Sequence, residues 1–162
     1  FNWIDGLDGL ATGITIISST GFIIVSLLSG NIPILLALIA LLGTCFGFLA
    51  FNFYPSKILM GDGGSYFLGS LIAISSILIN YQISKSFLIV WPVFMLFYPI
   101  MDISIVTFSR IFKGKFPFYP DQSHLHHRLI KIGFSHRNSV FFIYMVSFIF
   151  SILALLLLFY FR

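Results

Sequence analysis

The chain has 162 residues, of which 59% are hydrophobic and only 9% are charged, and its formal net charge is +4. Ordinary water-soluble domains have an apolar share nearer about 45–50%, so this composition excludes that class and indicates a membrane protein. The positive charge requires no nucleic-acid partner, and none is expected, because basic residues also set the orientation of a protein in the lipid bilayer.

Five apolar segments can be laid out along the chain, each on the order of 20 residues long, the length that crosses a bilayer. We predict that they form one all-α, polytopic bundle of transmembrane helices. The expected spans cover approximately residues 10–28, 32–53, 66–83, 87–108 and 139–161. Three loops then lie on the same side of the membrane, at residues 1–9, 54–65 and 109–138.

The basic residues predict which side that is. Most of them lie in the 54–65 and 109–138 loops, whereas only Lys85 and Arg162 fall on the other side. Cytoplasmic loops carry an excess of Lys and Arg, so we predict that these loops and residues 1–9 face the cytoplasm. The histidines and all acidic residues but one belong to the same loops or to span ends. We therefore expect the chemistry of this protein at the cytoplasmic face.

The first stretch with chemical potential is NWIDGLDG, residues 2–9. If it is helical, residues three apart share a face, so Asn2, Asp5 and Asp8 would form one polar stripe. The alternative is that Asp5 or Asp8 caps the following helix, whose N-terminus favours a carboxylate. A cap needs only one carboxylate, so two carboxylates and an amide favour a binding site at the membrane surface.

The second apolar segment contains the single cysteine, Cys45, and a G-x-x-x-G pattern at Gly43 and Gly47. One buried thiol makes neither a disulfide nor a cysteine-built metal site, so we interpret Cys45 as a small apolar side chain. Small residues four apart let two membrane helices approach closely, so we predict that Gly43 and Gly47 pack against a neighbouring helix.

The second stretch is NFYPSKILMGDGGS, residues 52–65. Its three glycines around Asp62 would let the backbone approach a ligand closely, and Ser65 is expected to open the next helix with free N–H groups. The alternative is a simple glycine-rich turn between two spans. Asp62 favours the site, because Mg²⁺ usually binds through one or two carboxylates together with substrate phosphates.

One acid, Asp102, lies inside the fourth expected span, where a charge costs about 2.5–3.5 kcal/mol on an insertion scale. We expect it to face the bundle interior or a wet cavity, where it could be a structural partner of a basic loop residue.

The third stretch is DQSHLHHR, residues 121–128. A zinc site is one interpretation of its histidines, but no H-E-x-x-H pattern and no cysteine ligand accompany them. Arg128 favours an anion instead, because a guanidinium binds phosphate in a bidentate way. We expect these histidines to bind phosphate or to handle protons, and His136 to be a solvent-exposed loop residue.

Together the three stretches resemble the polyprenyl-phosphate N-acetylhexosamine-1-phosphate transferases. The resemblance rests on NWIDGLDGLATG from Asn2, NFYPSKILMGDGGSYFLG from Asn52, PIMDISIVTFSR from Pro99, and FPFYPDQSHLHHRLIKIGFSHRN ending at Asn138. This family includes the phospho-N-acetylmuramoyl-pentapeptide transferases and the undecaprenyl-phosphate N-acetylglucosaminyl-1-phosphate transferases. The H-x-H-H-R form is more similar to the N-acetylglucosaminyl branch.

The resemblance implies a reaction. A UDP-N-acetylhexosamine, here expected to be UDP-N-acetylglucosamine, gives its sugar-1-phosphate to a polyprenyl phosphate such as undecaprenyl phosphate, with Mg²⁺ as cofactor and UMP as the second product. Such a reaction starts lipid-linked synthesis of peptidoglycan, lipopolysaccharide or another surface polysaccharide at a bacterial plasma membrane. The resemblance also implies a larger bundle, of which this chain would be the C-terminal half, inactive alone. Association as a homodimer is a further expectation.

The resemblance also assigns roles to single residues. Asp62 is implied as the catalytic metal ligand, with Asn2 near the metal, while Asp5 and Asp8 are implied to hold the nucleotide. The remaining implied contacts to substrate are Asn52, His124, His126, His127 and Arg128, the three histidines being catalytic.

Two features differ from the family pattern. The family has an aspartate pair in an earlier loop that finds no counterpart in these 162 residues. Leu59 stands where many members carry an aromatic residue that can stack on uracil. The competing hypothesis from another class is a fragment of an ion or metal transporter, which predicts ionisable residues on several spans, whereas only Asp102 lies within one.

Overall fold

The structure, a computed structural model, describes residues 1–83, 90–117 and 123–160. The described residues form helices without strands, which confirms the all-α prediction. The elements are η1 (Asn2–Ile4), a 3₁₀ helix, and the α-helices α1 (Leu10–Ser29), α2 (Ile32–Asn52), α3 (Gly61–Ile83), α4 (Val90–Met95), α5 (Phe97–Phe112), α6 (Leu125–Lys131) and α7 (His136–Tyr160). Asp121, Lys85 and Arg162, used in the sequence argument, lie outside the described residues.

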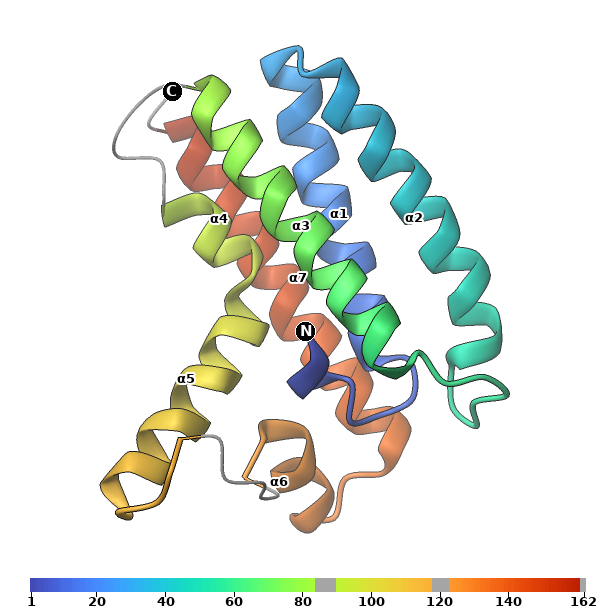
Figure 1. The fold of residues 1–162 in the computed structure, drawn as a ribbon, viewed down its shortest axis with the longest axis vertical. Helices are drawn as coiled ribbons and strands as arrows, with labels where there is room; N and C mark the ends of the chain where they lie inside the picture. Colours follow the sequence, from blue (N-terminus) through green and yellow to red (C-terminus); the bar gives the residue numbers. More distant parts are fainter. Residues whose placement is uncertain (84–89, 118–122, 161–162) are drawn as a thin grey trace.

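Four of these helices, α1, α2, α3 and α7, are long and apolar enough to cross a membrane, judged by length and composition. They coincide with four of the five predicted spans, although α3 begins at Gly61 rather than at residue 66. Figure 1 shows them running alongside one another, with α5 and α6 at the lower end. The chain therefore folds as a helical membrane bundle.

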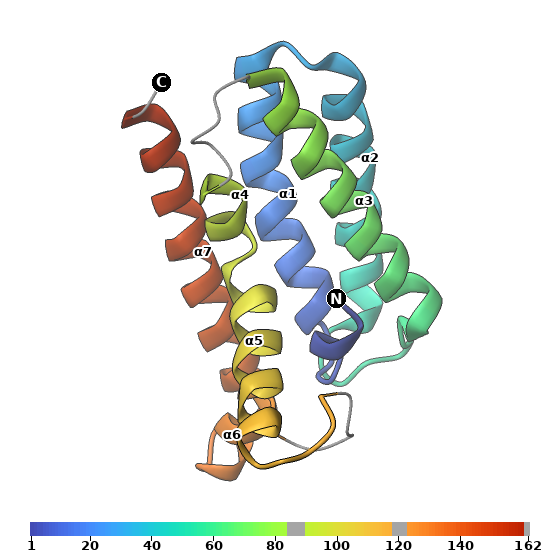
Figure 2. The same cartoon turned by 60° about the vertical axis from the view of Figure 1, so that its left-hand side comes forward.

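The predicted span at 87–108 is instead broken into α4 and α5, with Leu96 between them. Pro99 explains the break, because proline has no N–H to donate to the carbonyl of Met95 four residues earlier. The hydroxyl of Ser18 on α1 donates to that carbonyl at 3.2 Å instead. The break redirects the chain, so that α5 leaves α4 and runs down toward α6 (Figure 2).

Helix α1 is the centre of the bundle. Of the 18 most apolar consecutive residues of α1, 67% are buried. The corresponding share is 22% in α2 and in α3, and 28% in α7. Small residues allow this, because a Cβ at Gly13 would collide with Tyr144 of α7 and one at Gly21 with Met95. The outer helices expose Leu, Ile and Phe side chains, as expected of surfaces that meet lipid.

The G-x-x-x-G prediction is wrong for the described part of this chain. Gly43 and Gly47 are exposed on α2, and a Cβ built at either would meet no atom within 4 Å. The side of α2 that packs on α1 and α3 instead carries larger residues such as Leu38, Leu41 and Cys45, which are buried.

Candidate functional site

The three stretches identified in the sequence meet at one end of the bundle. The N-terminal segment, the α2–α3 loop and the α5–α6 region all lie at the lower end in Figure 1, and the second view agrees (Figure 2). The described Asp, His, Lys and Arg residues belong to these three segments, apart from His136 and Arg137, which begin α7. Residues far apart in sequence are thereby brought into one polar layer below an apolar bundle.

The N-terminal segment is not a continuous helix, so the predicted polar stripe does not form in that way. After η1 the chain turns, and Gly9 takes a left-handed conformation with φ of 78° before α1 begins at Leu10. The capping alternative is also excluded, because α1 has no side-chain cap. Asp8 instead accepts a hydrogen bond from the backbone N–H of Ser56 at 3.0 Å, which ties the segment to the α2–α3 loop.

The second stretch places Asp62 in the first turn of α3, where its side chain is exposed. Gly61 precedes it with φ of 67°, a conformation that favours glycine. The prediction that Ser65 opens the helix is wrong, since Ser65 is buried one turn inside it. Its hydroxyl donates to Oδ1 of Asn2 at 2.9 Å, and Nδ2 of Asn2 donates to the hydroxyl of Tyr66 at 3.3 Å.

Asn52 is buried at the C-terminal end of α2 and joins three segments. Its Oδ1 accepts hydrogen bonds from the hydroxyl of Thr12 at 2.9 Å and from the N–H of Gly9 at 3.2 Å. Its Nδ2 donates to the carbonyl of Ile58 at 3.0 Å. Through these three bonds Asn52 holds the end of α2 against the start of α1 and against the α2–α3 loop.

A cavity of about 250 Å³ opens between the N-terminal segment and the α2–α3 loop. Asp5 and Asp8 line it on one side and Leu59 and Gly61 on the other, with Asn52 also in the lining. Burial, and then the charges of Asp62 and Asp8, raise the pKa of Asp5 to about 6. Since burial disfavours the ionised carboxylate and two further carboxylates add to this effect, a cation or a hydrogen-bond donor bound beside Asp5 would favour its ionised form.

The described part of the third stretch leads into the short helix α6, which belongs to the same polar layer. His124 is its N-cap residue, and its Nδ1 lies 2.7 Å from Oδ2 of Asp102, which is buried on α5. The backbone N–H of Leu125 donates to Oδ1 of Asp102, also at 2.7 Å. The expectation that Asp102 faces the interior and partners a loop residue is thus confirmed.

His126 lies in the interior between α6 and the N-terminal segment. Its side chain is 1% exposed and its ring faces Gly6, where a Cβ would collide with it. Burial, and then the positive charge of neighbouring His127, lower the pKa of His126 to about 4. His126 is therefore neutral at physiological pH and can accept or donate a hydrogen bond without carrying charge.

This shifted pKa predicts how stability depends on pH. Between pH 6.5 and 4 the unfolded chain protonates His126 more readily than the folded chain, so stability is complete above 6.5 and is lost as the pH falls. We expect the melting temperature of the full-length protein in detergent to fall across this range, and to fall less in His126→Gln. An equal fall in both proteins would contradict the assignment.

The remaining residues of the third stretch are more accessible. His127 is partly buried and its ring lies 4.3 Å from that of His126, while Arg128 is exposed on α6. The prediction of a solvent-exposed His136 is wrong, because its ring stacks on Tyr54 at 4.4 Å. Arg137 donates to the carbonyl of Tyr54 at 3.1 Å, so the start of α7 holds the α2–α3 loop.

Two residues of this layer were not predicted from the sequence. The indole of Trp3 meets the His124 ring edge-on at 5.8 Å, and the guanidinium of Arg110 lies 5.3 Å from the centre of the Trp3 ring. Arg110 also donates to the carbonyl of Pro117 at 2.7 Å. Their neighbours in sequence give no sign of these contacts, which depend on how α5 meets η1.

Comparison with known proteins identifies the family. Residues 1–80 match glycosyl transferase family 4. A probable undecaprenyl-phosphate N-acetylglucosaminyl 1-phosphate transferase of Bacillus subtilis is 44% identical over 156 residues, or 96% of this chain and 44% of that protein. A decaprenyl-phosphate N-acetylglucosaminephosphotransferase of Mycobacterium leprae is 38% identical over 89% of this chain and 41% of its own length. The chain belongs to glycosyl transferase family 4.

The resemblance drawn from the three stretches is thus confirmed. The match extends to a phospho-N-acetylmuramoyl-pentapeptide-transferase of Desulforamulus reducens, which is 33% identical over 96% of this chain and 45% of that protein. The chain spans less than half the length of these curated relatives. Both branches named in the sequence analysis therefore occur among the relatives of this family 4 chain.

The donor atoms at the site fit the Mg²⁺ ion that the resemblance implies for this family 4 member. Among the described residues, no three His, Cys, Asp or Glu side chains lie close enough together to hold a metal ion on their own. Mg²⁺ does not need one, because it keeps several waters and binds through one or two carboxylates and substrate phosphates. Asp62 is exposed and would supply such a carboxylate. Its charge raises the pKa of Asp5, as does the charge of Asp8, so both carboxylates lie within electrostatic reach of Asp5.

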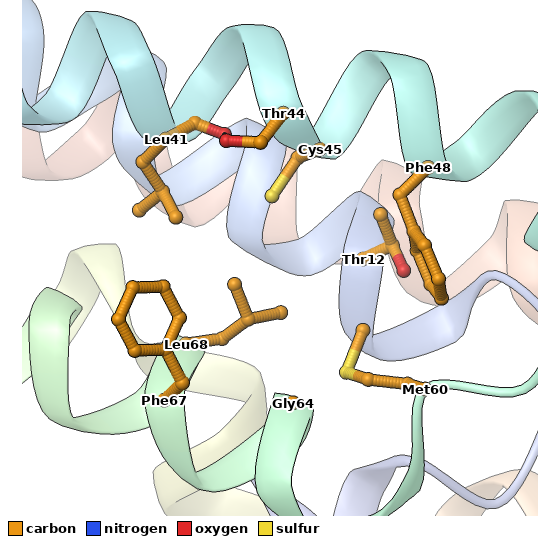
Figure 3. Close-up of a pocket in the computed structure, with 9 residues that line it drawn as sticks. All are labelled: Thr12, Leu41, Thr44, Cys45, Phe48, Met60, Gly64, Phe67 and Leu68. Carbon is orange, nitrogen blue, oxygen red and sulfur yellow. The ribbon is translucent and has the colours of Figure 1, made fainter.

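An apolar pocket of about 240 Å³ adjoins the polar cavity between α1, α2 and α3 (Figure 3). Figure 3 shows Cys45 and Phe48 of α2 facing Phe67 and Leu68 of α3 across it. Its threonine hydroxyls are bonded elsewhere, that of Thr12 to Asn52 and that of Thr44 to the carbonyl of Ala40. The pocket thus presents hydrocarbon, and Met60 lines both it and the polar cavity.

Proposed function

We propose that the full-length protein transfers N-acetylglucosamine-1-phosphate from its UDP derivative to a polyprenyl phosphate at the cytoplasmic face of the membrane. The observation that carries this proposal is the convergence of the three stretches on one polar layer at the end of a membrane bundle. The names of the relatives from Bacillus and Mycobacterium support it, since each describes a transferase of N-acetylglucosamine phosphate that acts on a polyprenyl phosphate.

In this reaction a phosphate oxygen of the lipid bonds to the β-phosphorus of the UDP-sugar. The bond from that phosphorus to the bridging oxygen breaks, and UMP leaves with the electron pair. Several negative charges meet in the process, so fixed positive charges and hydrogen-bond donors at the site stabilise the transition state. Arg128 and the α6 histidines would supply such groups, and α6 reaches the cavity wall where His126 faces Gly6.

The roles of the other residues follow from their places. Asp62 would hold Mg²⁺ with Asn2 beside it, and the bound ion would supply a positive charge to the diphosphate. Asp5 and Asp8 would hold the nucleotide, each through a carboxylate at the cavity wall. Asn52, whose amide makes three hydrogen bonds, would keep the wall of the cavity in place.

The apolar pocket next to the cavity suits the lipid acceptor. A polyprenyl phosphate must keep its phosphate in the polar layer while its chain stays in hydrocarbon. The pocket lies between helices that can cross the membrane and meets the polar cavity at Met60, so the isoprene units nearest the phosphate would find an apolar surface there. This arrangement supports a lipid rather than a soluble acceptor.

The proposal is tested with purified full-length protein in proteoliposomes. UDP-N-acetylglucosamine with labelled sugar is supplied with undecaprenyl phosphate and Mg²⁺, and label in the butanol-extractable lipid is counted. We expect lipid label that requires both the acceptor and Mg²⁺. Metal-ion flux across the vesicles without any lipid label would instead support the transporter hypothesis.

Filling the pocket tests its part in acceptor binding. Cys45 is 3% exposed, so Cys45→Phe would place a ring in the pocket. We expect the KM for undecaprenyl phosphate to rise about tenfold, since losing one or two kcal/mol of apolar contact has this effect, with the KM for the UDP-sugar unchanged. The matched control is Phe46→Trp, because Phe46 is the next residue on α2 and is exposed away from the pocket. Equal effects of both substitutions would contradict this assignment.

A further inference from the structure

We propose that Asp102 is a positioning residue of the transferase, which holds His124 in the tautomer that carries its proton on Nδ1. The other ring nitrogen, Nε2, is then the atom that can accept a hydrogen bond or a proton. This inference rests on the proposed function for its catalytic consequence, but the pairing of the two side chains can be measured without it.

The geometry of the pair is specific. Asp102 is 2% exposed, and each of its carboxylate oxygens has a separate partner at 2.7 Å: Oδ2 meets Nδ1 of His124, and Oδ1 accepts from the N–H of Leu125. A carboxylate with both oxygens occupied cannot rotate without losing a bond. Because an ionised carboxylate only accepts, Nδ1 of His124 must donate and therefore keeps its proton.

A purely structural role would leave half of this arrangement without an explanation. Leu125 is the first residue of α6, so the bond to its N–H caps that helix. A cap requires one oxygen, and the amide of asparagine would serve equally well. The second oxygen pairs with the imidazole of His124. A buried carboxylate that orients an imidazole also fixes which of the two ring nitrogens is protonated.

The surroundings of His124 show what its orientation affects. Its ring meets Trp3 of η1 edge-on at 5.8 Å and lies nearly parallel to the ring of His126 at 5.6 Å. Trp3 follows Asn2 directly, and His126 faces Gly6, so both neighbours connect His124 to the N-terminal segment that carries Asn2 and Asp5. Within the described part of the chain, no hydrogen bond occupies Nε2 of His124.

The break at Leu96 explains how a carboxylate from a membrane helix reaches this layer. Helix α5 leaves the line of α4 there and brings Asp102, its sixth residue, next to the start of α6. The tautomer of His124 is thus set by a residue 22 positions earlier in the chain, on a different helix.

The test uses Asp102→Asn in the full-length protein. Its Oδ1 can still cap α6, but its NH₂ group faces Nδ1 of His124, which must then accept and move its proton to Nε2. We expect kcat to fall at least about tenfold, with the KM for UDP-N-acetylglucosamine and the melting temperature close to wild type. Asp102→Glu, which keeps the acceptor, should recover part of kcat. The matched control is Ser104→Ala, two residues along α5, where the hydroxyl bonds only to the carbonyl of Ile100.

A second measurement does not depend on activity. Nitrogen-15 NMR of ring-labelled histidine in the full-length protein should show His124 protonated at Nδ1, and Asp102→Asn should shift the proton to Nε2. Wild-type kcat in Asp102→Asn, or the same tautomer in both proteins, would overturn the inference. If wild-type protein transfers no sugar phosphate, the proposed function fails, while the tautomer measurement still decides whether Asp102 controls His124.

Discussion

Asp62→Asn in the full-length protein should lower the rate of sugar-phosphate transfer by about 100- to 1,000-fold, the usual effect of removing one group that stabilises charge in a transition state. The substitution keeps the shape of the side chain and removes its negative charge. Asp62 is exposed in the first turn of α3, so the fold loses only the favourable interaction of a carboxylate with the helix N-terminus, about 0.3–1 kcal/mol. The loss should therefore appear in activity and not in stability.

The measurement is the rate of lipid labelling at several Mg²⁺ concentrations, together with the melting temperature. Raised Mg²⁺ should recover part of the activity of Asp62→Asn, because the weakened site fills at higher concentration. Ser70→Ala is the matched control on α3, since its exposed hydroxyl bonds only to the carbonyl of Phe67. Transfer at the wild-type rate in Asp62→Asn would show that the metal assignment is wrong.

Gly6→Ala should lower transfer about 100-fold, although it adds a single methyl group. A Cβ at Gly6 would collide with the imidazole of His126, which is 1% exposed. The added methyl must displace His126 or the wall of the cavity that contains Asp5. A displacement on the order of 1 Å at a catalytic group can cost about 100-fold in rate.

The control for this substitution is Gly43→Ala on α2. A Cβ there meets no atom within 4 Å, and alanine is the better helix former by about 1 kcal/mol, so activity should be unchanged and the melting temperature equal or higher. Both rates are measured with the same lipid-labelling assay. Wild-type activity in Gly6→Ala would show that the contact between the N-terminal segment and His126 has no part in the reaction.

Much of the fold could be predicted from the sequence, because the membrane imposes one strong constraint. A span needs an uninterrupted apolar segment of about 20 residues, and α1, α2 and α7 agree closely with the predicted segments. The break between α4 and α5 was missed, since the apolar pattern continues through Leu96. The signal was present in Pro99, but proline in a membrane helix can also be accommodated without a break.

The candidate site was predicted as a set of residues but not as a set of contacts. Residue type pointed to Asp5, Asp8, Asp62 and the α6 histidines, because acids and histidines are costly in an apolar chain. The contacts depend on tertiary structure, as with the bond from Ser56 to Asp8 and the three bonds that Asn52 makes. No local pattern could show that Trp3 meets His124 or that Gly6 faces His126.

The structure also changes the interpretation of the two N-terminal acids. Asp8 does not cap α1 but holds the α2–α3 loop, and Asp5 lies in the cavity wall with a raised pKa. Both acids therefore belong to the contact between the first two stretches. This contact places Asp62, on the far side of the same loop, within electrostatic reach of Asp5.

The central claim is that a sugar phosphate, and not the sugar alone, moves to the lipid, and one measurement tests it directly. Full-length protein in proteoliposomes is given undecaprenyl phosphate, Mg²⁺ and UDP-N-acetylglucosamine labelled with phosphorus-32 at the β-phosphate. The account predicts that the label enters the lipid fraction and that unlabelled UMP is released. Label recovered in UDP, or none in the lipid while sugar is transferred, would contradict it.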